Sequence, residues 1–188
     1  NRAKKISLFQ LNSMKHILKK LIRNESGLFL LIFAFAAFFY MFKLGFSDLW
    51  SDEIYTKTML EGSLPDLFAK FKNDLHPPLY YLALRVFTDL FGFNVTTLRL
   101  FSVLGVLSTL LLGYFAGQRI FGKQGALYFC LMLISIPMLA AYSHQGRMYT
   151  WAAFSGTGVF LYAYLFMKTG KNRDLVFLFV FTVISMYV

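Results

Sequence analysis

The stretch from Gly27 to Phe46 constrains the fold most strongly, because its 20 residues contain a single charge, Lys43. At about 1.5 Å per residue, a helix of this length crosses the roughly 30 Å hydrocarbon core of a bilayer. With 57% hydrophobic and only 15% charged residues, the chain lacks the polar surface of a soluble domain. We therefore expect an all-α protein, a polytopic transmembrane helical bundle. Further apolar runs of spanning length follow at 98–117, 126–142 and 150–167, and another begins at 175–188.

Positive charge is concentrated ahead of the first apolar run, in the segment 1–26. The chain carries a net charge of +10, and six of these charges come from seven basic residues opposed by Glu25, namely Arg2, Lys4, Lys5, Lys15, Lys19, Lys20 and Arg23. Apolar residues recur between the lysines at roughly helical spacing, which predicts a basic amphipathic helix on the cytoplasmic face. Such a cluster beside a span indicates orientation and attraction to anionic membrane lipids. No nucleic-acid-binding motif accompanies it, so we expect no nucleic-acid partner.

Residues 47–77 form the most acidic part of the chain. They hold six of its nine acidic residues: Asp48, Asp52, Glu53, Glu61, Asp66 and Asp74. Gly62-Ser63-Leu64-Pro65 predicts a break between two short helices, 53–61 and Asp66 to Phe71, lying along the membrane surface. We interpret this segment as an external catalytic loop within a transmembrane domain that covers 27–188.

A short helix is predicted over 78–93, opening at Pro78, a residue that suits the first turn of a helix. Arg85 and Asp89 are four residues apart, so we expect them to share a face and to pair.

The basic turns 119–123 and 168–173 decide how this helix is placed. If 78–93 crosses the membrane fully, both turns fall outside, against the positive-inside rule. We therefore prefer a re-entrant or outer-surface position for 78–93. This arrangement brings residues 144–147 back to the side of Asp52.

Asp52 and Glu53 are the first candidates for chemistry. One alternative is structural: Ser51 or Asp52 caps a helix that begins near Glu53, with acid in its first turn. Adjacent helical residues point about 100° apart, so the two carboxylates should not act as a facing pair. We expect one to face the site and the other to be structural or a metal ligand.

Three cations are candidates for binding an anion: His76, Arg99 and Arg147. The alternative is that His76 donates to a backbone carbonyl and that the arginines reach to lipid headgroups. Arg147 stands in a dense polar segment with Gln145 and Tyr149, which favours a functional role.

The order of these elements resembles one superfamily, the fold-C (GT-C) integral membrane glycosyltransferases. The motifs are Asp52-Glu53, His76-Pro77-Pro78-Leu79, Arg99-Leu100-x-Ser102 and Gln145-x-Arg147-Met148-Tyr149. The chain is most similar to the dolichyl-phosphate-mannose–protein mannosyltransferases and the lipid A aminoarabinose transferase, over residues 27–170. The resemblance implies a GT-C-like bundle of which this chain is the N-terminal portion. Because the chain ends at Val188 within an apolar run, we expect it to be truncated at its C-terminus.

The resemblance also implies residue roles. Asp52 matches the catalytic carboxylate of the family, and His76 and the arginines match positions near the lipid-phosphate sugar. The family often has an acid where this chain has Gln145 and Gly146. No cofactor is therefore assigned, and a divalent metal ion is left open.

The chemistry of these residues fits the same reaction. A phosphate leaves as an anion and needs no proton, whereas the acceptor hydroxyl needs a base, here Asp52, with Glu53 beside it in the catalytic pair. Three cations would bind the donor phosphate, His76, Arg99 and Arg147. Four further residues are candidates for binding substrate: Trp50, Tyr55, Tyr149 and Gln145. For Trp50 and Tyr55 the alternative is an interfacial aromatic belt.

We therefore expect a membrane glycosyltransferase that moves a sugar from a polyprenyl-phosphate donor to the hydroxyl of a protein, lipid or polysaccharide. It would be a multi-pass integral membrane protein with its active site on the external face, and if the chain is bacterial or archaeal, the membrane would be the plasma membrane. The alternatives are a transporter or flippase of lipid-linked sugars and a non-catalytic membrane scaffold.

Overall fold

The computed structural model describes residues 24–72 and 76–188, and within them the protein is all-helical, as predicted. Most of the basic segment 1–26, with its predicted amphipathic helix, and Asp74 lie outside the described residues. The helices are α2 (Glu25–Met41), α3 (Ser51–Leu60), α4 (Leu64–Phe71), α5 (Pro78–Phe91), α6 (Val95–Ile134), α7 (Pro137–Ser143), α8 (Tyr149–Thr169) and α9 (Asn172–Tyr187).

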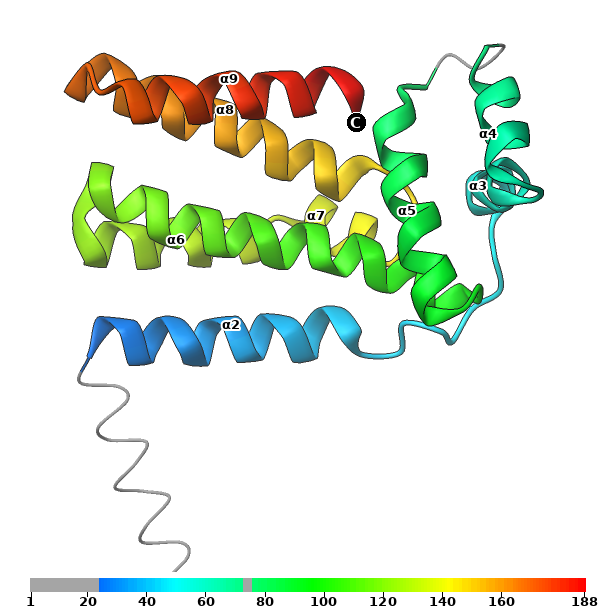
Figure 1. Ribbon diagram of the computed structural model, residues 1–188. Helices are drawn as coiled ribbons and strands as arrows, with labels where there is room; N and C mark the ends of the chain where they lie inside the picture. Colours follow the sequence, from blue (N-terminus) through cyan, green and yellow to red (C-terminus); the bar gives the residue numbers. More distant parts are fainter. Residues whose placement is uncertain (1–23, 73–75) are drawn as a thin grey trace, which may run out of the picture.

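The long helices α2, α6, α8 and α9 lie side by side (Figure 1). The core between α2 and α6 includes a stacked pair, Phe29 and Tyr114, with ring centroids 3.8 Å apart. Tyr40 and Ala36 of α2 are fully buried against the same core. Among the described residues, one helix, Val95–Ile134, is long and apolar enough to cross a bilayer; α2 is apolar but shorter.

Helix α6 is a hairpin of two limbs rather than one straight rod. The chain turns at Gly122, whose φ of 72° lies in the left-handed region that favours glycine. The second limb folds back on the first, so the Cys130 thiol donates a hydrogen bond to the Leu110 carbonyl at 3.5 Å. The turn therefore falls between the predicted segments 98–117 and 126–142, in the basic stretch 119–123.

The segment predicted over 126–142 is interrupted. Helix α6 ends at Ile134, and α7 begins at Pro137. Proline cannot donate a backbone hydrogen bond and disfavours helical geometry at the residue before it. Ile136 accordingly has an extended backbone, with a ψ of 111°.

Helix α5 lies across one end of the bundle, with α3 and α4 beside it (Figure 1). The predicted helix at 78–93 is therefore confirmed, and it does not run parallel to the long helices. This placement agrees with the preferred arrangement, while the side of the membrane on which it lies stays a prediction.

A buried ion pair ties the opposite end of the bundle together. Arg119 Nη2 donates to the Asp174 carboxylate at 2.6 Å, and the Thr169 hydroxyl donates to the same oxygen at 2.9 Å. Asp174 is fully buried. This contact joins α6 to the α8–α9 turn, so it fixes the end of the molecule that lies away from α5.

Candidate functional site

The first turn of α3 presents its two acidic residues in different directions. Trp50 stands at the N-cap, and its backbone N–H donates to Glu53 Oε2 at 3.3 Å. The capping residue is thus neither Ser51 nor Asp52, and the carboxylate that satisfies the helix start belongs to Glu53. Glu53 is fully buried, whereas Asp52 is partly exposed.

Glu53 forms a two-point ion pair with Arg99 from the start of α6. Arg99 Nε donates to Glu53 Oε1 at 2.8 Å, and Nη2 donates to Oε2 at 2.7 Å. The backbone N–H of Gly146 also donates to Oε1, at 2.7 Å. One buried carboxylate therefore joins α3, α6 and the α7–α8 loop.

The remaining donors of Arg99 all reach the chain's own acceptors. Nη1 donates to the carbonyls of Leu44 and Ser47 at 3.0 Å each, and Nη2 donates to the Asp48 carbonyl at 3.0 Å. Arg99 is 3% exposed. The α2–α3 connection is thus wrapped around a guanidinium whose three nitrogens are all hydrogen-bonded, which offsets the cost of burying the charge.

Arg147, in the loop before α8, is also buried, at 5% exposure, but its contacts are long. Nη1 lies 3.4 Å from both the Asp52 carbonyl and the Thr56 hydroxyl, and Nη2 lies 3.3 Å from His76 Nε2. Its Nε has no hydrogen-bond partner within residues 24–72 and 76–188. The guanidinium therefore retains donor capacity.

Aromatic side chains lie close to Arg147, and its pKa is raised. The guanidinium carbon lies 5.8 Å from the Tyr55 ring centroid and 6.0 Å from that of Tyr149. Burial lowers the pKa of Arg147, but Tyr81, Tyr149 and Asp52 outweigh it, and the pKa is raised above its ordinary value. The Asp52 carboxylate thus acts electrostatically on Arg147.

The structure brings most of the predicted site residues into one cluster. His76 lies beside Tyr55, with ring centroids 5.8 Å apart, and Tyr149 packs on Tyr142. Gln145 Oε1 is buried and has no partner in the part of the chain that is described. Trp50 lies apart: the residue is 44% exposed, and its hydrogen bonds to Glu53 and Ile54 are made by its backbone.

Sequence reasoning missed several residues that shape the cluster. The Ser102 hydroxyl lies within hydrogen-bond distance of the carbonyls of Gln145 (2.5 Å) and Arg147 (3.2 Å), which anchors the loop to α6. Thr56 and Tyr81 face Arg147. The spacing Arg99-x-x-Ser102 carried a signal, because residues three apart share a helix face.

The cluster carries no recognisable metal site. Within the described ranges, no group of three or more His, Cys, Asp or Glu side chains is placed to hold a metal ion. Gln145 and Gly146 provide an amide and a backbone N–H where an acidic ligand would stand.

The protein is thus an apolar helical bundle with a cluster of buried charged residues at one end. The family model of dolichyl-phosphate-mannose-protein mannosyltransferases matches residues 75–188 of the 188-residue chain. The chain therefore belongs to this family of membrane-embedded glycosyltransferases, which confirms the resemblance seen in its motifs. The matched region includes His76, Arg99 and Arg147 and begins after Asp52 and Glu53. No curated protein and no solved structure matches the chain.

Proposed function

We propose that this protein transfers a sugar from a polyprenyl-phosphate donor to an acceptor hydroxyl, with Asp52 as the general base. The observation that carries the proposal is Arg147, a buried cation whose Nε has no partner among the described residues and whose Nη1 lies 3.4 Å from the backbone carbonyl of Asp52. A phosphate beside this guanidinium would supply the acceptor oxygens that the described chain does not.

In the proposed step the acceptor oxygen attacks the anomeric carbon as the bond between that carbon and the phosphate oxygen breaks. The hydroxyl proton passes to the Asp52 carboxylate. The phosphate leaves with the bonding electron pair, and Arg147 and His76 stabilise its negative charge. Inversion at the anomeric carbon is the outcome that family resemblance implies. Tyr55, Tyr149 and Gln145 would contact the sugar.

We assign Glu53 and Arg99 to positioning rather than to direct contact with the donor. Their hydrogen bonds are made to each other and to backbone groups of 44–48 and Gly146. This pair would hold the Asp52 end of α3 against the loop that carries Arg147, which fixes the distance between base and phosphate-binding cation.

We place this site on the non-cytoplasmic face of a multi-pass membrane protein. Support comes from the basic stretches 119–123 and 168–173, which lie at the end of the bundle away from α5 (Figure 1). Cytoplasmic loops carry an excess of lysine and arginine, so this end would face the cytoplasm. The flippase alternative has less support, since Arg85 and Asp89 lie on α5 rather than within a helix of the long bundle.

Asp52→Asn tests the base. With the full-length protein in proteoliposomes and a panel of polyprenyl-phosphate sugars, we expect transfer to fall about 10²- to 10⁴-fold, the usual contribution of a general base. Asp48→Asn is the matched control, because the contact that Asp48 makes to Arg99 uses its backbone carbonyl. Transfer at the wild-type rate by a well-folded Asp52→Asn protein would refute the assignment.

A further inference from the structure

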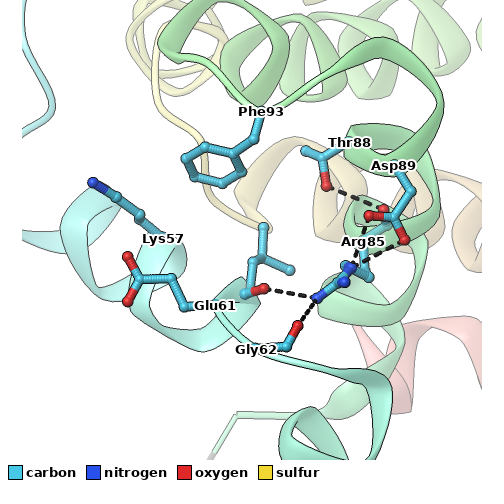
Figure 2. Close-up of a pocket in the computed structure, with 8 residues that line it drawn as sticks. Lys57, Glu61, Gly62, Arg85, Thr88, Asp89 and Phe93 are labelled. Carbon is cyan, nitrogen blue, oxygen red and sulfur yellow. Dashed lines mark hydrogen bonds and ion pairs between the residues drawn. The ribbon is translucent and has the colours of Figure 1, made fainter.

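A cavity of about 320 Å³ lies between the C-terminal end of α3 and the C-terminal half of α5. Figure 2 shows the residues of both helices that line it, with Phe93 just beyond α5; the charged ends of Lys57 and Glu61 point away from Arg85 and Asp89. Four charged residues line the cavity, two basic and two acidic: Lys57, Arg85, Glu61 and Asp89. Its volume falls within the range of small-molecule sites.

One wall of the cavity is fixed by Arg85. Its Nε donates to both carboxylate oxygens of Asp89, at 2.9 and 3.0 Å, as the spacing of four residues predicted. Its Nη1 donates to the carbonyls of Leu60 and Gly62 at 2.8 and 2.7 Å (Figure 2). The guanidinium thus ties the end of α3 to α5, so the wall is ordered before any ligand arrives.

Other polar groups in the cavity remain available. Within the described residues, no hydrogen bond reaches Arg85 Nη2, the Lys57 ammonium or the Glu61 carboxylate. The side chain of Asp89 is 57% exposed, which leaves lone pairs open beyond its bonds to Arg85. The cavity therefore offers donors and acceptors together.

The four charges sum to zero, which favours a ligand without net charge over an anion or a cation. A phosphate would meet two carboxylates, and a simple cation would meet two cations. A sugar hydroxyl donates and accepts at once, so neighbouring hydroxyls can bond to Glu61 and Lys57 together. Such bonds to charged groups are stronger than bonds between neutral groups.

Phe93 adds an apolar surface. Its side chain is 45% exposed, and Figure 2 shows its ring turned toward Lys57 and Glu61. The C–H face of a pyranose is apolar and gains from packing against such a ring. Phe93 would therefore pack against the apolar C–H face of a sugar, while the neighbouring charged side chains bond to its hydroxyl groups.

We propose that this cavity binds a neutral sugar residue of the acceptor, and the assignment to an acceptor rests on the proposed transferase function. Asp52, in the first turn of α3, and Glu61, its C-cap residue, are nine residues apart, which corresponds to roughly 14 Å along the helix axis and about half a turn around it. An acceptor that occupies both positions must extend beyond the reacting residue. The substrate class is therefore a glycan or an acceptor already bearing a sugar.

Direct binding tests the site without turnover. The full-length Asp52→Asn protein in nanodiscs is titrated with manno-oligosaccharides of two to four residues by saturation-transfer NMR. Lys57→Gln, Glu61→Gln and Phe93→Leu change exposed side chains, and we expect each to weaken binding about tenfold, the loss of one hydrogen bond to a charged group or of one apolar contact. Phe91→Leu and Lys72→Gln are the matched controls, and we expect them to change binding less than twofold.

Two results would overturn the proposal. One is oligosaccharide binding that is absent or that the three cavity variants leave unchanged. The other is saturable binding of phosphoethanolamine with the same dependence on Lys57 and Glu61, which would make the cavity a site for a zwitterionic lipid headgroup. Transfer activity measured in parallel keeps the two questions apart, because an active Asp52→Asn protein refutes the base and leaves the binding result standing.

Discussion

Arg99 and Arg147 belong to the same polar cluster and are almost equally buried, at 3% and 5% exposure, yet they differ in their contacts. All three nitrogens of Arg99 reach acceptors of the chain, mostly at 2.7–3.0 Å. The contacts of Arg147 are 3.3–3.4 Å long, and its Nε has no partner among the described residues. Two arginines that are equally buried can therefore differ in how completely the chain satisfies their hydrogen-bond donors.

We interpret this difference as one of role: Arg99 stabilises the fold, and Arg147 serves the proposed binding of the donor. A buried cation with complete hydrogen bonds stabilises the arrangement that surrounds it, whereas unused donors in a buried place cost free energy. Under the proposed function, the unused donors of Arg147 are reserved for the donor phosphate. We therefore expect substitutions at Arg99 to act on stability first and substitutions at Arg147 to act on transfer first.

The largest expected effect is a loss of stability when one member of the Glu53–Arg99 ion pair is removed. Arg99→Met leaves the Glu53 carboxylate buried without its cation, and we expect the free energy of unfolding to fall by about 3–5 kcal/mol. Chemical denaturation in detergent, followed by intrinsic fluorescence, measures this loss. The double variant Glu53→Leu with Arg99→Met removes both charges, and we expect it to be more stable than Arg99→Met alone. If Arg99→Met were as stable as the wild type, the structural role of Arg99 would be wrong.

Arg147→Met should give the opposite pattern. We expect transfer to fall about 10²- to 10³-fold, the cost of removing one donor that stabilises developing charge. The free energy of unfolding should change by less than about 1 kcal/mol, because the contacts that are lost are long. Rates in proteoliposomes and unfolding in detergent are measured on the same preparation. A large loss of stability together with unchanged transfer would reverse the two roles.

Ligand-linked stabilisation sharpens the contrast further. If Arg147 binds the donor phosphate, a polyprenyl phosphate at 100 times its dissociation constant should stabilise the wild type by about 2.7 kcal/mol. The same addition should give Arg147→Met much less, while Asp48→Asn, the control, should respond as the wild type does. Equal stabilisation of all three proteins would show that the phosphate binds elsewhere.

Local sequence patterns predict part of these features, and the rest depend on contacts between residues that are far apart in the chain. The divergence of Asp52 and Glu53 follows from helix geometry, and the Arg85–Asp89 pair follows from a spacing of four. The pairing of Glu53 with Arg99 joins residues 46 apart, and no local pattern encodes it. For this reason the sequence alone predicts Arg99, like Arg147, to bind the donor phosphate.

The interruption of α6 before α7 has a different cause. Pro137 is visible in the sequence and signals a helix boundary, whereas the prediction of one segment over 126–142 rests on its apolar composition and length. The topology around α5 was inferred from loop charge rather than from local pattern, since its short apolar sequence fits either a span or a surface helix.

The smallest expected effect falls on the residue that links the two arginines. Gly146 donates to Glu53, the partner of Arg99, and directly precedes Arg147. A Cβ at this position would lie 3.1 Å from Leu98 Cβ and 3.5 Å from Glu53 Oε1, so the loop must shift by a few tenths of an ångström.

We therefore expect Gly146→Ala to cost about 1 kcal/mol of stability, at the low end for an overpacked site. The same shift moves Arg147, so transfer should fall by a larger factor than stability alone explains, with the Michaelis constant for the donor changed more than that for the acceptor. Gly156→Ala, where an added Cβ meets open space, is the matched control. If Gly146→Ala lowers stability but leaves the donor Michaelis constant unchanged, the Glu53–Arg99 pair supports the fold without positioning Arg147.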